Sequence, residues 1–399
     1  MIYQDKQTPF FVFDEKIIAK ELMHLQQAIH QFWSNTIIAY SVKTNPLPYL
    51  AKYMNENNIY AEVVSEDEYD LVHLCGYNSR HIICNGPIKS KHFIYELLSK
   101  HCYLNIDSHA ELKYVTDYAI SHKKETCEVG IRVNIDIEKY FPNESKGGSY
   151  GSRFGFSPDN HEFEEAIGIL KKINNVVITG LHLHVSTSTR RPEIYQWLSQ
   201  YFAFLVKKYR LNDIKYFDIG GGFYGGIEGK PGWADYLNAI RETLIEESFM
   251  AERLTLIIEP GVSLLAGAFS YYMTVTDIKD TPRGHFVVTD GSRIHIDPLF
   301  HKTNYYYDCL ISEERETCPS QIIVGFTCLE YDLIMELLNS EELKVGDIIR
   351  CDKLGAYTIA LTPLFISYFP AVYLKKNDGT YSCIRKKWTA QEFMQTSIL

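Results

Sequence analysis

Lys43 is the first residue of this chain whose type and place could do chemistry. It follows the apolar run 39–42 and precedes the pair Asn45-Pro46. A lysine at the end of a buried strand points its amine into the cavity that the strand faces, where it loses its proton or finds a partner. A neutral amine there is the nucleophile of Schiff-base enzymes. Taken alone, Lys43 is better explained as a side chain that extends from the strand end to solvent. The rest of the chain reverses that preference.

The chain around Lys43 alternates, from about residue 36 to residue 261, between short apolar runs and amphipathic segments. Ser65 with Glu68, and Ser108 with Glu111, fit helix capping boxes, and segments 193–210 and 233–249 have helical periodicity. Eight such units match a closed (β/α)8 barrel, and a doubly wound open sheet is the competing architecture. The eight predicted strands are 37–42, 59–64, 81–84, 102–106, 129–133, 177–185, 214–219 and 254–258.

The pattern changes after Gly261. Short β-rich runs separated by turn residues indicate an antiparallel β domain. The run 9–13 is a strand with no barrel helix after it at a normal spacing, so we assign it to the same domain. The expected domains are a barrel at 35–265 and a β domain formed by 1–34 and 266–399. The predicted strands of the β domain are 269–275, 286–289, 321–324, 347–351 and 371–374.

Polar residues follow several of the predicted barrel strands. The carboxyl ends of barrel strands form the active site of such folds, and a run of glycines there lets backbone N–H groups approach a phosphate. Alone, each residue has a simpler explanation: a flexible turn, a packed histidine or a solvated carboxylate. Together, an amine, a phosphate cradle, an imidazole and a carboxylate indicate pyridoxal phosphate (PLP). The residues at the strand ends are Lys43, Asn85, Arg132 to Asn134, His184 to Thr187, Gly220 to Gly222, and Glu259.

Eight motifs in order extend this pattern over residues 40–358. They are Tyr40-Ser41-Val42-Lys43-Thr44-Asn45-Pro46, Val64-Ser65-Glu66-Asp67-Glu68, Ser152-Arg153-Phe154-Gly155, Leu183-His184-Val185-Ser186-Thr187, Ile219-Gly220-Gly221-Gly222-Phe223, Ile258-Glu259-Pro260-Gly261, Cys328-Leu329-Glu330-Tyr331-Asp332 and Gly355-Ala356-Tyr357-Thr358. In this order they resemble the fold-type III, alanine racemase-like PLP decarboxylases. That group contains diaminopimelate, ornithine, arginine and carboxynorspermidine decarboxylases.

The resemblance implies roles for the matching residues. Lys43 would hold PLP covalently, His184 would stack on its ring, and Glu259 would keep the ring nitrogen protonated. Cys328 of the partner subunit would protonate the product carbanion, so the active sites of a homodimer would be shared, and Asp332 would support the cysteine loop. The implied phosphate ligands are Thr187, Gly221, Gly222 and Tyr357.

Three departures from the family pattern bear on the substrate. The family usually has Arg after Glu-Pro-Gly, where this chain has Val262; Arg190 or Arg191 would replace it, or would form a solvated pair. The family usually has an acidic residue directly after the cysteine, where this chain has Leu329. Asp297 stands where diaminopimelate decarboxylases usually carry Arg. The expected substrate is therefore a modified or conjugated amino acid, such as a siderophore or natural-product intermediate. The candidate substrate contacts are Arg153, Asp297, Glu330 and Asp332.

Composition limits the remaining function classes. A formal net charge of −10 argues against nucleic acid or an anionic membrane as a partner. No apolar run reaches the ~18 residues of a membrane span, and the first residues lack the plan of a signal peptide. Nine scattered cysteines and the lack of a zinc pattern favour a cytoplasmic protein without a metal site. An amino-acid racemase on the same fold and a non-catalytic homologue are the alternatives; Glu259 disfavours the first, and retained Lys43 and Cys328 disfavour the second.

Overall fold

The computed structural model describes residues 2–225, 227–395 and 397–398. The chain divides into two compact units, one from Glu21 to Ser263 and one that joins the residues up to Lys20 with those from Leu264 onward. The first division falls within helix α2 (Glu15–Phe32). The domain boundaries at 34/35 and 265/266 stay predictions.

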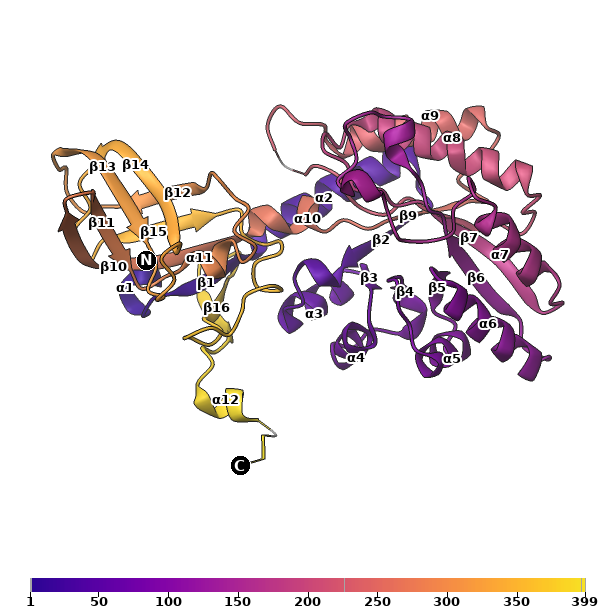
Figure 1. Cartoon of the computed structure of the whole chain (residues 1–399), viewed down its shortest axis with the longest axis horizontal. Coiled ribbons are helices and arrows are strands. Elements are labelled where there is room, and N and C mark those ends of the chain that lie inside the picture. Colours follow the sequence, from indigo (N-terminus) through magenta and orange to yellow (C-terminus); the bar gives the residue numbers. More distant parts are fainter. Residues whose placement is uncertain (1, 226, 396, 399) are drawn as a thin grey trace. The chain divides into compact units, whose positions relative to one another are not determined.

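The unit from Glu21 to Ser263 contains a closed barrel of eight parallel strands, so the predicted (β/α)8 fold is confirmed (Figure 1). The last strand pairs with the first through Thr36 with Leu256 and Ile38 with Ile258. Every strand lies within two residues or so of its predicted start, because each is a buried apolar run. The strands are β2 (Thr36–Ser41), β3 (Tyr60–Val63), β4 (Ile82–Cys84), β5 (Tyr103–Ile106), β6 (Cys127–Arg132), β7 (Val176–His182), β8 (Tyr216–Asp218) and β9 (Thr255–Ile258).

Helices separate these strands in the chain and lie outside the barrel (Figure 1). The hydroxyls of Ser65 and Ser108 cap two of them by accepting the N–H groups of Glu68 and Glu111. The glutamate side chains reach one residue farther back than a capping box requires, to the N–H groups of Val64 and Asp107. The helices are α3 (Pro48–Glu56), α4 (Glu66–Leu74), α5 (Lys91–Ser99), α6 (His109–Ser121), α7 (Glu162–Lys171), α8 (Pro192–Lys208) and α9 (Trp233–Glu246).

Tyr216 fills the interior of the barrel. A methyl group at Gly180 on β7 would overlap its ring, and one at Gly130 on β6 would overlap its hydroxyl and the side-chain oxygen of Asn105, so only glycine fits at either position. The Tyr216 hydroxyl donates to Oδ1 of Asn105 on β5 at 2.9 Å. This bond fixes Asn105, the first member of the polar network that leads to the site.

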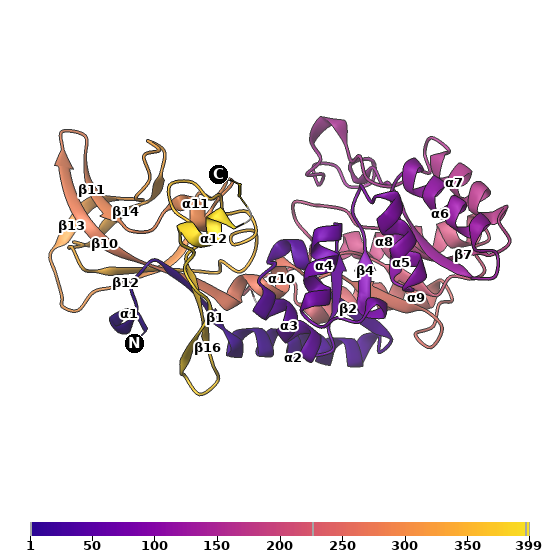
Figure 2. The same cartoon turned by 90° about the horizontal axis from the view of Figure 1, so that it is seen from below.

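The second unit is a mostly antiparallel sheet, as expected (Figures 1 and 2). Strand β1 (Phe10–Asp14) lies between β10, to which it is antiparallel, and β16, to which it is parallel, so the N-terminal strand belongs to this sheet. The other strands are β10 (Phe269–Thr281), β11 (Gly284–Thr289), β12 (Tyr306–Leu310), β13 (Thr317–Val324), β14 (Leu333–Glu341), β15 (Ile348–Asp352), β16 (Ala371–Lys375) and β17 (Tyr381–Arg385), and the short helices of this unit are α1 (Ile2–Asp5), α11 (Arg293–Ile296) and α12 (Ala390–Met394).

One expectation about the N-terminal region is wrong. A helix, α2, directly follows β1, where the sequence predicted none. Its buried residues Ile18, Leu22, Leu25 and Ile29 recur at helical spacing, which was the signal available in the sequence. No helix among the described residues is long and apolar enough to cross a membrane.

Candidate active site

Lys43 lies in the 3₁₀ turn Val42–Thr44, directly after β2. Its amine forms an ion pair with Glu62 of β3 and donates to the Ser41 hydroxyl at 3.1 Å. Glu62 is 1% exposed. Burial alone would raise the pKa of Glu62, but the Lys43 charge and the hydrogen bonds of Lys43, Ser41 and Asn85 hold that pKa below its usual value. Lys43 has therefore found a partner, and Glu62 is a site residue that sequence reasoning missed.

Two amides connect the buried carboxylates at the strand ends. Asn85 donates to Glu259 Oε1 at 2.5 Å and to Glu62 Oε1 at 3.3 Å. Asn105 donates to Asn85 Oδ1 at 2.9 Å and to Asp218 Oδ2 at 3.0 Å. The two amides thus fix the orientation of Glu259, the residue predicted to contact the ring nitrogen of PLP.

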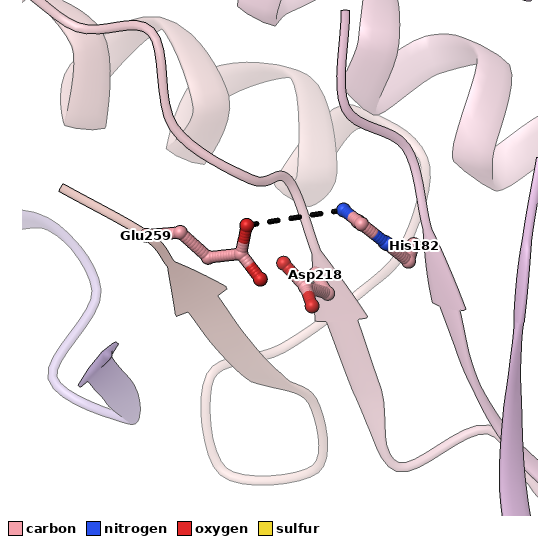
Figure 3. A group of neighbouring side chains, drawn as sticks. All are labelled: His182, Asp218 and Glu259. Carbon is pink, nitrogen blue, oxygen red and sulfur yellow. Dashed lines mark ion pairs between the residues drawn. The ribbon is translucent and has the colours of Figure 1, made fainter. Parts of the chain in front are cut away.

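His182, Asp218 and Glu259 form a buried group at the ends of β7, β8 and β9 (Figure 3). His182 Nε2 lies 3.9 Å from Glu259 Oε2. Burial, with the charges of Arg132, His184, Lys43 and Lys89, lowers the pKa of His182, so its ring is neutral. Neither ring nitrogen has a hydrogen-bond partner among the described residues.

The two carboxylates of this group do not both ionise easily. Burial and the like charge of Glu62 raise the pKa of Asp218 to about 7. Burial, Asp218 and Glu62 raise the pKa of Glu259 well above its usual value. A cationic ring nitrogen at Glu259 would offset this penalty. An imidazole and two carboxylates are also metal-ligand types, but Asp218 already accepts from Gly220 N–H and Asn105, and Glu259 accepts from Asn85.

The turn Gly220 to Gly222 follows β8 and packs against His184. The Gly221 N–H donates to His184 Nδ1 at 3.2 Å. Burial, then the charges of Arg132 and Lys43, lowers the pKa of His184 to about 3, so this imidazole is neutral and suited to stacking on a ring. A side chain at Gly220 would overlap His184, and one at Gly221 would overlap the Glu259 carbonyl.

The turn has the donors that a phosphate needs. Gly222 has a φ of +90°, which favours glycine. The N–H groups of Gly222 and Phe223 donate to no acceptor among the residues that the structure describes. Thr187, the other predicted phosphate ligand in the barrel, is buried in the loop between β7 and α8. The residues present therefore fit PLP.

Arg153, a candidate substrate contact, lies in the loop between β6 and α7 and is exposed. Its guanidinium lies 4.3 Å from the centre of the Phe154 ring, and that of Arg132 lies 4.5 Å from the same ring. Arg132 is held by Asp107 at 3.0 Å. Phe154 therefore contacts one fixed and one exposed cation.

The predicted cysteine lies in the second unit, on the loop between β13 and β14. Cys328 is exposed, and so is Glu330. Asp332 is buried and accepts from the N–H of Thr327 at 3.2 Å, from its hydroxyl at 2.6 Å, and from the hydroxyl of Ser292. Asp332 thus holds the loop that carries Cys328.

Asp297, a second candidate contact in this unit, is 4% exposed and fully engaged. Arg293 donates to it through Nε at 3.0 Å and Nη2 at 2.9 Å. It also accepts the N–H groups of His301 and Lys302. Tyr357, a predicted phosphate ligand, is exposed and has a φ of +55°.

A (β/α)8 barrel with a lysine, a carboxylate, an imidazole and a glycine turn at its strand ends defines a PLP enzyme. Residues 18–266 match the family described as "Pyridoxal-dependent decarboxylase, pyridoxal binding domain", and the chain belongs to that family. It is a PLP-dependent amino-acid decarboxylase, a carbon–carbon lyase.

Relatives share the whole length of the chain. Diaminopimelate decarboxylase of Aquifex aeolicus is 25% identical and covers 98% of this chain and 92% of its own. The L-glutamyl-[BtrI acyl-carrier protein] decarboxylase of Niallia circulans is also 25% identical, with 98% and 94% covered. The structure of diaminopimelate decarboxylase from M. jannaschii in complex with L-lysine is similar in fold, with a TM-score of 0.87 at 23% identity over 100% of this chain and 94% of that one.

Proposed function

We propose that the strand ends of the barrel hold PLP in one orientation. The amine of Lys43 holds it covalently, neutral His184 covers one ring face, and ionised Glu259 keeps a proton on the ring nitrogen. Gly221, Gly222, Thr187 and Tyr357 bind the phosphate. Bound PLP supplies a ring that accepts the electron pair left behind when the α-carboxylate leaves as CO2.

We propose that the proton which replaces CO2 comes from Cys328 of the partner subunit, in a homodimer. The support is the exposure of this thiol on a loop that buried Asp332 holds through Thr327. Arg153 and Glu330, both exposed, stay candidate substrate contacts.

The proposed substrate is an α-amino acid whose far end carries no free ammonium, either modified or conjugated. The bonds of Asp297 carry this proposal: Arg293 and two backbone N–H groups engage its carboxylate. A distal ammonium that loses water needs an unengaged acid. Leu329 offers none, and the exposed Glu330, one position later, is the alternative acid on this loop. The relative from Niallia circulans, named for a glutamyl group on a carrier protein, supports a conjugated substrate. The several diaminopimelate decarboxylases among the relatives make meso-diaminopimelate the second candidate.

Steady-state kinetics separate the two candidates. We expect kcat/KM on ornithine, lysine, arginine and meso-diaminopimelate to stay below about 10⁴ M⁻¹s⁻¹, and an amide- or thioester-linked glutamyl compound to exceed them. Leu329→Asp should raise kcat/KM on the free diamino acids, because it restores an acid beside the cysteine, whereas Leu329→Asn, without the charge, should not. Efficient turnover of any of the four by the unmodified protein would contradict the proposal.

A mixing experiment tests the shared active site. Lys43→Ala and Cys328→Ala subunits are each expected to be inactive, and exchange between them should restore part of the activity, since one of the two hybrid sites keeps both residues. Subunit exchange is confirmed by mass spectrometry with one isotope-labelled variant. If exchanged dimers stay inactive, each site is built from one chain.

A further inference from the structure

Arg190 lies in the loop between β7 and α8, two residues before the first helical residue, Pro192. Its φ of +51° is in the left-handed region, which a residue with a side chain rarely adopts. The Tyr236 hydroxyl donates to the Arg190 carbonyl at 2.6 Å and accepts the Tyr224 N–H at 3.3 Å. The Tyr236 hydroxyl therefore connects the backbone of Arg190 to the backbone of Tyr224, two residues after the glycine turn.

The guanidinium of Arg190 lies against the same segment. Its Nη1 is 3.5 Å from the Phe223 carbonyl oxygen, and its Cζ is 5.3 Å from the centre of the Tyr224 ring. Tyr195, whose hydroxyl donates to the Gly221 carbonyl at 3.1 Å, stacks on Phe223 at 4.6 Å. The guanidinium of Arg190 thus contacts the residues after the glycine turn directly, and the Arg190 carbonyl is connected to them through Tyr236.

A full positive charge beside the backbone donors of this turn would strengthen the binding of a phosphate dianion. The N–H groups of Gly222 and Phe223 supply partial charges, whereas a guanidinium supplies a fixed charge and a planar pair of donors. The adjacent Arg191 is engaged elsewhere: its Nε lies 3.5 Å from Glu144 Oε1 and its Cζ 5.2 Å from the Phe141 ring.

We propose that Arg190 is the cation that pairs with the phosphate of PLP at the glycine turn. It takes the place of a cation at position 262, where this chain has valine. The left-handed backbone of Arg190, held by Tyr236, is what keeps the guanidinium at the turn. Arg191 has no part in binding the phosphate.

The test compares two ligands that differ only in the phosphate. The full-length protein, freed of cofactor, is titrated with PLP and with pyridoxal, and binding is followed by protein fluorescence. Arg190→Gln, which removes the charge and leaves a shorter polar side chain, is expected to weaken PLP binding about 30-fold, the scale of a charge-assisted hydrogen bond. Pyridoxal binding should change less than about threefold, and the matched control Arg191→Gln should alter neither affinity.

Arg190→Lys tests whether a positive charge at this position is sufficient for phosphate binding. It keeps the cation in the same loop and is expected to retain most of the PLP affinity. Circular dichroism and the thermal midpoint confirm that each variant is folded. Any of three results would overturn the proposal: unchanged PLP affinity in Arg190→Gln, an equal loss for PLP and pyridoxal, or an Arg190→Lys variant as weak as Arg190→Gln. Because the readout is cofactor affinity, the result does not depend on the substrate.

Discussion

Lys43→Ala is expected to lower the rate of CO2 release by ~10⁴-fold or more, the scale on which removal of a covalent catalytic group acts. The variant should also lack the visible absorbance of a lysine-bound cofactor. Borohydride reduction followed by peptide mass mapping should place the cofactor on Lys43 in the unmodified protein. The matched control is Lys52→Ala, which changes an exposed lysine on the neighbouring helix α3 and should retain both the absorbance and the rate.

The loss of Lys43 has a structural consequence that must be separated from catalysis. The variant leaves Glu62, which is 1% exposed, without its cation. A buried charge without its partner is destabilising. The double variant Lys43→Ala with Glu62→Gln should regain stability but no activity. A reduced lysine adduct in either variant would show that another lysine carries the cofactor.

Glu259→Gln is expected to fold and to lose activity ~10²-fold, because one charge-assisted contact in a dry site is worth on the order of 3 kcal/mol. A carboxamide cannot hold the ring nitrogen protonated, and Asn85 can still donate to its oxygen. The loss should appear in kcat. The control is Glu128→Gln, at a surface residue paired with Lys215, which should leave kcat unchanged. An unchanged kcat would remove Glu259 from the mechanism.

The sequence was sufficient for the barrel and for the residues that end its strands. Strands such as β2 and β9 are continuous apolar runs because both faces are buried, and this pattern is local in the chain. Lys43 and Glu259 each follow such a run directly, and His184 lies two residues after the end of β7. Their place at one end of the barrel then followed from the fold class alone.

What the sequence did not give depends on contacts between distant segments. Glu62 is one polar residue in the strand Tyr60–Val63, and only pairing with β2 brings it to Lys43. Asp218 and His182 become site candidates only because the fold places them beside Glu259, which follows another strand. Strands β12, β14 and β17 were missed; most of their residues are exposed or only partly buried.

One measurement tests the central claim most directly: the holoenzyme is incubated with α-amino acids, free and conjugated, while CO2 release and the chirality of the remaining substrate are followed together. Decarboxylation by a site with Glu259 at the ring nitrogen predicts CO2 and the matching amine in equal amounts, with the chirality of the residual substrate unchanged. Racemisation without CO2 would contradict the account.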